Sequence, residues 1–329
     1  MKKILNFLNK YKFYLIVTLI CFLLYKINLP YYVLTPGGTI NLDNRVEVST
    51  NEKIDGSLNL LYVNQYNATI PTYLLSKVLK NWDLEKIEDE QVNNETVDEI
   101  YTRNQIMLDN SLQNATFVAY NYANKDLTIT KSLNYVIATT TDNNFKVGDI
   151  IQKINDQDIS NLKDIQTIIE SCNVGDTITA TILRNNKEKT ITNKVTEQNN
   201  QKLLGIVVMT NYEYKTDPTI KFKFKSTESG SSGGLMLALT IYDLISDDNL
   251  TSGKNIAGTG TISLDGTVGE ISGIKYKIMG AVKNKMDLIL VPEANYQEAL
   301  QVKKDFNYDI PIVPVKTFEE ALNYLKENS

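Results

Sequence analysis

The chain has 329 residues, of which 42% are hydrophobic and 22% charged, and its formal net charge at pH 7 is −5. At about 150 residues per domain, this length predicts about two domains, each large enough to bury a core of its own. The negative charge does not favour nucleic-acid binding, which depends on a basic surface. The chain contains no histidine, which excludes a Ser-His-Asp triad, a Cys-His dyad and a histidine-ligated metal within it.

The cysteines restrict the chemistry further. The only two are Cys21 and Cys172, so a four-cysteine metal cluster is impossible. A disulfide between them would join an apolar N-terminal segment to a distant part of the chain. We therefore expect folding without disulfides and no metal or organic cofactor. Acid–base chemistry would have to use lysine, aspartate, glutamate, tyrosine or cysteine.

An apolar run near the N-terminus predicts a membrane anchor. The run extends over 19 residues, from Tyr11 to Leu29, and Pro30 is expected to end its helix. At about 1.5 Å per residue it measures about 28 Å, close to the thickness of a hydrocarbon core. The alternative is a cleaved signal peptide, but no small-x-small cleavage site follows the run.

Lysines around this run set the expected orientation. They lie mainly before its apolar core, against the single Lys26 close after it. Positive charge on the N-terminal side places the N-terminus in the cytoplasm. We therefore expect a single-pass protein of the cell membrane that contacts the lipid bilayer through residues 11–29, with residues 31–329 outside the cytoplasm.

Residues 31–122 predict short strands followed by helices. Strand-like segments at 31–34, 45–48 and 57–63 are separated by turn signals, and a helical pattern at 70–79 ends near Trp82. The acidic stretch from Asp83 to Glu95 is expected to be a loop. A long amphipathic helix is predicted from about Thr96 to Tyr122. Its candidate buried residues are Ile100, Ile106, Met107, Leu112 and Ala115.

Residues 123–198 predict a small β-rich module. Two Val-Gly-Asp turns lead into strands, and an amphipathic helix over residues 161–172 lies between them. With VGDIIQKINDQDI at 147–159 and VGDTITATILRNNK at 174–187, the module resembles a PDZ domain. The alternative is a generic small barrel.

The PDZ resemblance implies binding of an extended peptide as an added strand. The groove would be formed by the helix that starts at Asn161 and by one strand segment. The residues of that segment are Leu133, Asn134, Tyr135 and Val136. The glycine of the usual carboxylate-binding loop is not evident, which puts tight capture of a free C-terminus in doubt.

Residues 199–329 alternate strands and helices, as in an α+β domain with a mixed sheet. A Ser- and Gly-rich segment, from Ser229 to Gly234, precedes an apolar helix. It fits a flexible turn, a phosphate loop, or a turn that exposes a serine nucleophile. The interpretation as a phosphate loop is excluded because no Gly-Lys-Ser/Thr follows the segment.

A serine nucleophile without histidine needs another base, and lysine is the usual substitute. Such a lysine must be neutral, so its pKa has to fall through burial. Lys277 shares one predicted helix face with Ile274, Ile278 and Ala281, whereas Lys275 is rotated away from it. The alternative is a lysine on the surface that extends its amine into solvent.

Together these segments resemble the proteolytic domain of Lon-type serine peptidases. The Gly-Ser-Ser-Gly-Gly turn ending at Gly234, the Thr-Gly-Thr-Ile segment from Thr259, and Gly-Ile-Lys-Tyr-Lys ending at Lys277 correspond to the family's motifs. The resemblance implies that Ser232 is the nucleophile, Lys277 the base and Thr259 a residue that contacts the dyad. It also implies that the backbone amides of Ser232 and Gly233 hold the oxyanion.

The sequence departs from the family pattern at a few positions. Ser231 replaces the proline before the nucleophile, Gly233 an alanine, and Ser272 the first glycine of the lysine motif. Ser229 stands where an acidic residue is often found. These departures add serine hydroxyls near the predicted nucleophile.

The predicted architecture is a cytoplasmic N-terminus and anchor (1–30), an N-terminal part of the peptidase body (31–122), the PDZ-like module (123–198) and the Lon-type domain (199–329). It resembles the membrane-anchored PDZ-containing Lon-like proteases of Gram-positive bacteria, in which the PDZ module interrupts an α+β peptidase body. The expected function is an ATP-independent serine endopeptidase that cleaves secreted or membrane proteins outside the cytoplasm. The alternative is a non-catalytic PDZ adaptor on a Lon-like scaffold. The sequence leaves open whether the chain forms a homo-oligomer.

Overall fold

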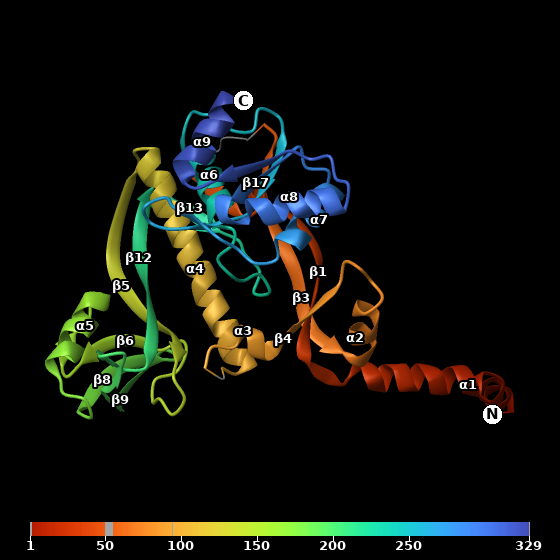
Figure 1. Ribbon diagram of the computed structural model, residues 1–329, viewed down its shortest axis with the longest axis horizontal. Helices are drawn as coiled ribbons and strands as arrows, with labels where there is room; N and C mark the ends of the chain where they lie inside the picture. Colours follow the sequence, from red (N-terminus) through yellow and green to blue (C-terminus); the bar gives the residue numbers. More distant parts are fainter. Residues whose placement is uncertain (1, 50–54, 94, 329) are drawn as a thin grey trace.

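A six-stranded sheet forms the centre of the larger of two bodies (Figure 1). The structure is a computed structural model that describes residues 2–49, 55–93 and 95–328. In spatial order the strands are β18 (Ile312–Val315), β17 (Leu288–Pro292), β14 (Asn255–Gly258), β3 (Ser57–Thr69), β1 (Asn28–Asn41) and β4 (Asp83–Lys86). The first four are mutually parallel, whereas β1 is antiparallel to both β3 and β4. The predicted mixed sheet is confirmed, and it joins strands from both ends of the chain.

Helices cover both faces of this sheet. One layer contains α4 (Val97–Tyr122), α6 (Gly234–Ile245) and α9 (Phe318–Glu327), and the other contains α7 (Ile274–Lys283) and α8 (Tyr296–Asp305). Alternate strand residues face the two layers, as the strand geometry requires. In β14, Ile256 packs into the core with α6 and its neighbour Ala257 packs into the core with α7.

A second sheet forms the smaller body. Its strand order is β12 (Ile206–Asp217), β5 (Asp126–Thr139), β6 (Ile150–Ile154), β8 (Thr177–Arg184) and β9 (Lys187–Lys194), with β7 (Gln157–Asp158) beside β6. Helix α5 (Leu162–Ser171) packs on it, and isoleucines dominate the shared core. The outer strand β12 comes after residues 123–198, and the long β5–β12 ladder extends from the small body alongside α4 (Figure 1).

Shorter elements connect these layers. They are β2 (Val46–Val48) paired with β13 (Ile220–Phe222), β10 (Thr196–Gln198) with β11 (Gln201–Leu203), β15 (Thr261–Ile262) with β16 (Val268–Gly269), helices α2 (Ile70–Ser76) and α3 (Ile87–Glu90), and 3₁₀ turns at Leu42–Asn44 and Glu293–Asn295.

The N-terminal helix differs from the expected segment. Helix α1 (Lys2–Tyr25) ends before residue 29, and β1 begins at Asn28. Pro30 is therefore a strand residue and does not end the helix. Over the described residues, no helix combines the length and the hydropathy that a membrane span requires.

Two further expectations between residues 31 and 95 need correction. Pro36, Gly37 and Gly38 lie inside β1 at a register shift and do not end it. A side chain at Gly37 would lie 2.1 Å from the carbonyl oxygen of Tyr62 in β3, so glycine is needed there for close strand approach. The acidic stretch from Asp83 begins with β4 and α3, because β4 pairs with β1.

Candidate active site

The predicted nucleophile lies in the turn that leads into α6. Ser232 is half-buried, and Gly233 is the N-cap residue of the helix. Gly234 packs tightly, because an added Cβ would lie 2.8 Å from the backbone nitrogen of Ile262. The small residues thus let α6 approach β15. The polar turn is thereby fixed beside the end of β14.

The predicted base is buried in the apolar face of α7. Lys277 is 3% exposed and shares its face with Ile274, Ile278 and Ala281, which are fully buried. Among the described residues no carboxylate forms an ion pair with it. Burial lowers the pKa of Lys277 from 10.5 to about 7, since an apolar environment disfavours the charged amine. The amine is therefore partly neutral near neutral pH.

Thr259 connects the lysine to the serine turn. The Lys277 Nζ donates to Thr259 Oγ1 at 3.0 Å, and Thr259 Oγ1 donates to the carbonyl oxygen of Ser232 at 3.0 Å. The same carbonyl accepts the backbone N–H of Gly260 at 2.8 Å. Thr259 directly follows β14, where the left-handed Gly260 separates it from β15. The structure thus brings Ser232, Thr259 and Lys277 together.

The backbone amides of Ser232 and Gly233 meet one requirement of an oxyanion site. Within the described part of the chain, neither amide donates to a protein acceptor, whereas the next two amides donate to the carbonyls of Ser231 and Gly260. Free amides at a helix start carry partial positive charge. This end of α6 can therefore stabilise an anion next to the Ser232 hydroxyl.

Ser111 is a residue of the site that sequence reasoning missed. It lies on the buried face of α4, 3% exposed, and its Oγ donates to the carbonyl oxygen of Ser231 at 3.1 Å. The expected apolar face of α4 is buried except at Met107, which is half-buried. Ser111 lies four residues before the buried Ala115. This helical spacing is the signal that would have identified it.

The first turn of α7 is held by a carboxylate from the edge of the sheet. Asp83 in β4 accepts from Lys275 Nζ at 2.5 Å and from the Tyr276 hydroxyl. Burial opposes ionisation of Asp83, but these two hydrogen bonds outweigh it and lower its pKa below the usual value. Lys275 thus points away from Lys277, as the helical spacing predicts. The cluster fixes the helix that carries the buried amine.

The strand segment predicted to line a peptide groove lies inside the sheet of the smaller body. Asn134 and Tyr135 of β5 pair with β12 on one side and with β6 on the other, whereas Leu133 pairs only with β12. The N–H of Val136 donates to the carbonyl oxygen of Asp149, so within the segment from Leu133 to Val136 the last three residues have no free edge for strand addition. Among the described strands, β12 and β9 form the two edges of this sheet, and β12 is the one next to β5.

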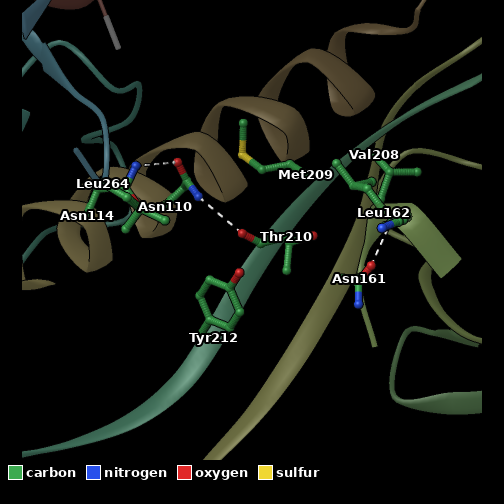
Figure 2. A pocket seen from close by; sticks show the side chains of 10 residues that line it. Asn110, Asn114, Asn161, Leu162, Val208, Met209, Thr210, Tyr212 and Leu264 are labelled. Carbon is green, nitrogen blue, oxygen red and sulfur yellow. Dashed lines mark hydrogen bonds between the residues drawn. The ribbon is translucent and has the colours of Figure 1, made fainter. Parts of the chain in front are cut away.

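A cavity of about 460 Å³ lies along this edge. Figure 2 shows side chains from β12, from the start of α5 and from α4 around it. They include Val208, Met209 and Thr210 of β12, Asn161 and Leu162 at the start of α5, and Asn110 and Asn114 of α4. The Gln113 side chain of α4 accepts the N–H of Tyr212, which closes the edge beyond this point. The carbonyl oxygen of Thr210 also accepts from the Asn110 side chain of α4 at 3.4 Å, so residues 206–209 form the part of the β12 edge without such contacts to α4.

Comparisons with known proteins match a part of each of the two bodies. The family model of the Lon protease (S16) C-terminal proteolytic domain matches residues 225–327, and a PDZ domain model matches residues 125–195. Lon protease of Neorickettsia sennetsu is 31% identical over 99 residues, which are 30% of this chain and 12% of that protein. Lon protease of Mesomycoplasma hyopneumoniae is 33% identical over 98 residues, 30% of this chain and 11% of that protein.

Among solved structures, the PDZ domain of the SdrC-like protein from Listeria monocytogenes is 22% identical, covers 25% of this chain and 92% of its own, and has a TM-score of 0.23. The chain spans about an eighth of the length of the curated relatives that it matches.

The two family matches show that the chain contains a Lon-type proteolytic domain, which is a serine peptidase domain, and a PDZ domain. Both predicted domain resemblances are confirmed. Ser232, Thr259 and Lys277 all lie inside the matched Lon range.

Proposed function

We propose that this chain is an ATP-independent serine endopeptidase in which Ser232 is the nucleophile and Lys277 the general base. The observation that carries the proposal is the buried amine of Lys277, which has no ion pair in the described part of the chain and is hydrogen-bonded through Thr259 to the backbone of Ser232. A buried unpaired lysine destabilises a fold, so its presence beside a serine turn favours a catalytic role.

The proposed reaction starts with the neutral amine. It donates one N–H to Thr259 and keeps its lone pair for the Ser232 hydroxyl proton. Oγ then attacks the scissile carbonyl, and the amides of Ser232 and Gly233 stabilise the oxyanion. The protonated lysine returns its proton to the leaving amine. Water activated by the same lysine hydrolyses the acyl-enzyme and frees Oγ.

Cleavage of a denatured protein substrate by the purified chain tests this proposal. We expect Ser232→Ala and Lys277→Ala each to lower the rate on the order of 10³-fold or more, with an unchanged circular dichroism spectrum. Undiminished cleavage by Ser232→Ala would overturn the assignment. Absence of cleavage by the unmodified chain, with peptide binding retained, would favour a non-catalytic PDZ adaptor.

We also propose a membrane location, with the N-terminus in the cytoplasm and the peptidase outside it. The support is the apolar sequence of α1 and the exposure of its side chains, since Phe13 and Tyr14 are 70% and 67% exposed. Figure 1 shows α1 extending away from the two bodies. Protection of the first residues from protease in sealed cells, with digestion of the bodies, tests this orientation.

Polypeptides are the proposed ligands of the smaller body. The open edge at residues 206–209 offers main-chain groups, and Leu162 of α5 lines the cavity beside it. An extended peptide added to β12 would satisfy that edge. A labelled unstructured peptide should bind the unmodified chain, and Val208→Pro should weaken its binding because proline disrupts the edge. Equal binding by both proteins would contradict this position.

A further inference from the structure

An apolar patch lies on α2 and the turn after it. We call Leu74, Leu75, Val78 and Leu79 the α2 patch; all four are exposed, Val78 by 78%. They follow helical spacing, and the turn continues the helical hydrogen bonding because the N–H groups of Val78 and Leu79 both donate to the carbonyl of Leu75. Four large aliphatic side chains on one face of a short segment form a surface that water solvates poorly.

Aromatic and basic side chains surround the α2 patch. The ring centroids of Tyr73 and Tyr31 are 5.6 Å apart, and those of Trp82 and Tyr66 are 6.2 Å apart. Lys77 and Lys80 are exposed, and no carboxylate occurs in the sequence between Ile70 and Trp82. Tyrosine and tryptophan favour the headgroup region of a bilayer, and lysine favours anionic lipids.

The position of the α2 patch matches this composition. Helices α1 and α2 are in contact, and Figure 1 shows α2 beside the junction of α1 and β1, on the opposite side of the molecule from the smaller body. The exposed apolar side chains of α1 include Ile20 and Tyr25. The medium that covers the C-terminal end of α1 is therefore also next to the α2 patch.

From these observations we infer that the α2 patch inserts into the interfacial region of a lipid bilayer. Leu74, Leu75, Val78 and Leu79 contact the upper acyl chains, and Lys77 and Lys80 contact anionic headgroups. This inference rests on the proposed anchoring by α1. It gives the peptidase body a second membrane contact and thereby sets its orientation on the membrane.

The chain contains a built-in probe for this contact. Trp82 is its only tryptophan, so the tryptophan fluorescence reports on the edge of the α2 patch alone. The full chain is reconstituted into vesicles of phosphatidylcholine and phosphatidylglycerol that carry bromine at different depths of the acyl chain. We expect quenching of Trp82, stronger with bromines near the glycerol backbone than with bromines near the terminal methyl group.

Two matched variants separate this contact from the anchor. Val78→Glu places a charge in the α2 patch, and Val174→Glu makes the same change at an exposed valine of the smaller body. Both should float with vesicles through α1 and both should cleave a soluble peptide in detergent. Val78→Glu should lose the depth-dependent quenching of Trp82, whereas Val174→Glu should keep it.

Each other outcome overturns a definite statement. Protein that floats without quenching of Trp82, or with equal quenching in Val78→Glu, overturns the α2 patch as a bilayer contact. Fluorescence that changes with the protein-to-lipid ratio but not with bromine shows that a second copy covers the patch, and also overturns it. Failure to float overturns the anchor together with this inference. Absence of peptide cleavage by the unmodified chain overturns the proposed catalytic function and leaves the bilayer contact standing.

Discussion

Replacing Lys277 by methionine tests whether the buried amine of Lys277 destabilises the fold. Methionine keeps the length of the side chain and removes the charge. The pKa of Lys277 falls from 10.5 in the unfolded chain to about 7 in the fold. At about 1.4 kcal/mol per pH unit, this difference corresponds to at most about 5 kcal/mol of lost stability.

The direction with pH follows from proton linkage. Between about pH 7 and 10.5 the unfolded chain binds a proton at Lys277 that the folded chain lacks, so stability rises with pH in this window. Below about pH 7 both states are protonated, and the folded state carries the full cost of a buried charge. Lys277→Met should therefore stabilise the fold by several kcal/mol near pH 6, and the gain should shrink toward pH 10.

Guanidinium unfolding in detergent, followed by Trp82 fluorescence, measures this gain. Trp82 is a suitable probe because its ring packs on Tyr66 of β3, which belongs to the same sheet as β14. Lys283→Met, at an exposed position in the last turn of α7, is the matched control and should change stability little at any pH. A change in stability for Lys277→Met that is the same near pH 6 and near pH 10, whether a gain or a loss, would refute the reasoning.

Three further outcomes follow from the same contacts. The cleavage rate should rise as pH passes about 7 and then level off, because only neutral Lys277 accepts a proton; a rate that is flat from about pH 5 to about pH 9 would contradict this. Thr259→Val should lower kcat roughly ten- to hundredfold by removing the hydroxyl between Lys277 and Ser232, and Thr259→Ser should restore most of it; equal kcat values for both would count against the link. Burial raises the pKa of Asp243 from 3.8 to about 6, so ionising it costs stability as pH rises through that window. Asp243→Asn, which keeps an acceptor for the Leu250 N–H, should add up to about 3 kcal/mol near pH 8 and little near pH 4 in unfolding experiments; a gain that does not vary with pH would contradict the burial argument.

The sequence predicted the elements whose pattern is local. The spacing of Ile274, Lys277, Ile278 and Ala281 predicted the buried face of α7, and all four side chains are buried. The Thr-x-x-Glu motif at Thr96 forms a capping box at the start of α4, close to the expected helix start. Periodicity and capping are properties of neighbouring residues, so one sequence is enough to show them.

Features that depend on distant partners could not be predicted in this way. Asp83 lies in a strand because β4 pairs with the edge of β1. Gly37 lies in a strand because the absence of a side chain leaves room for the backbone of Tyr62. Asn134 is enclosed because Thr210 of β12, 76 residues later, pairs with its outer side. The contact of Ser111 with the serine turn joins segments 120 residues apart. Each of these features depends on contacts between segments that are far apart in the sequence. The hydrophobic pattern of a single segment does not show such contacts.

Covalent labelling tests the proposed Ser232–Lys277 dyad most directly. The full chain is incubated with a fluorophosphonate that modifies activated serines, and the labelled peptide is identified by mass spectrometry. The account predicts labelling at Ser232 that requires Lys277, so the label disappears in Lys277→Met and persists in Lys283→Met. Labelling at Ser229 or Ser231, or labelling of Ser232 that is equally fast in Lys277→Met, would contradict the dyad.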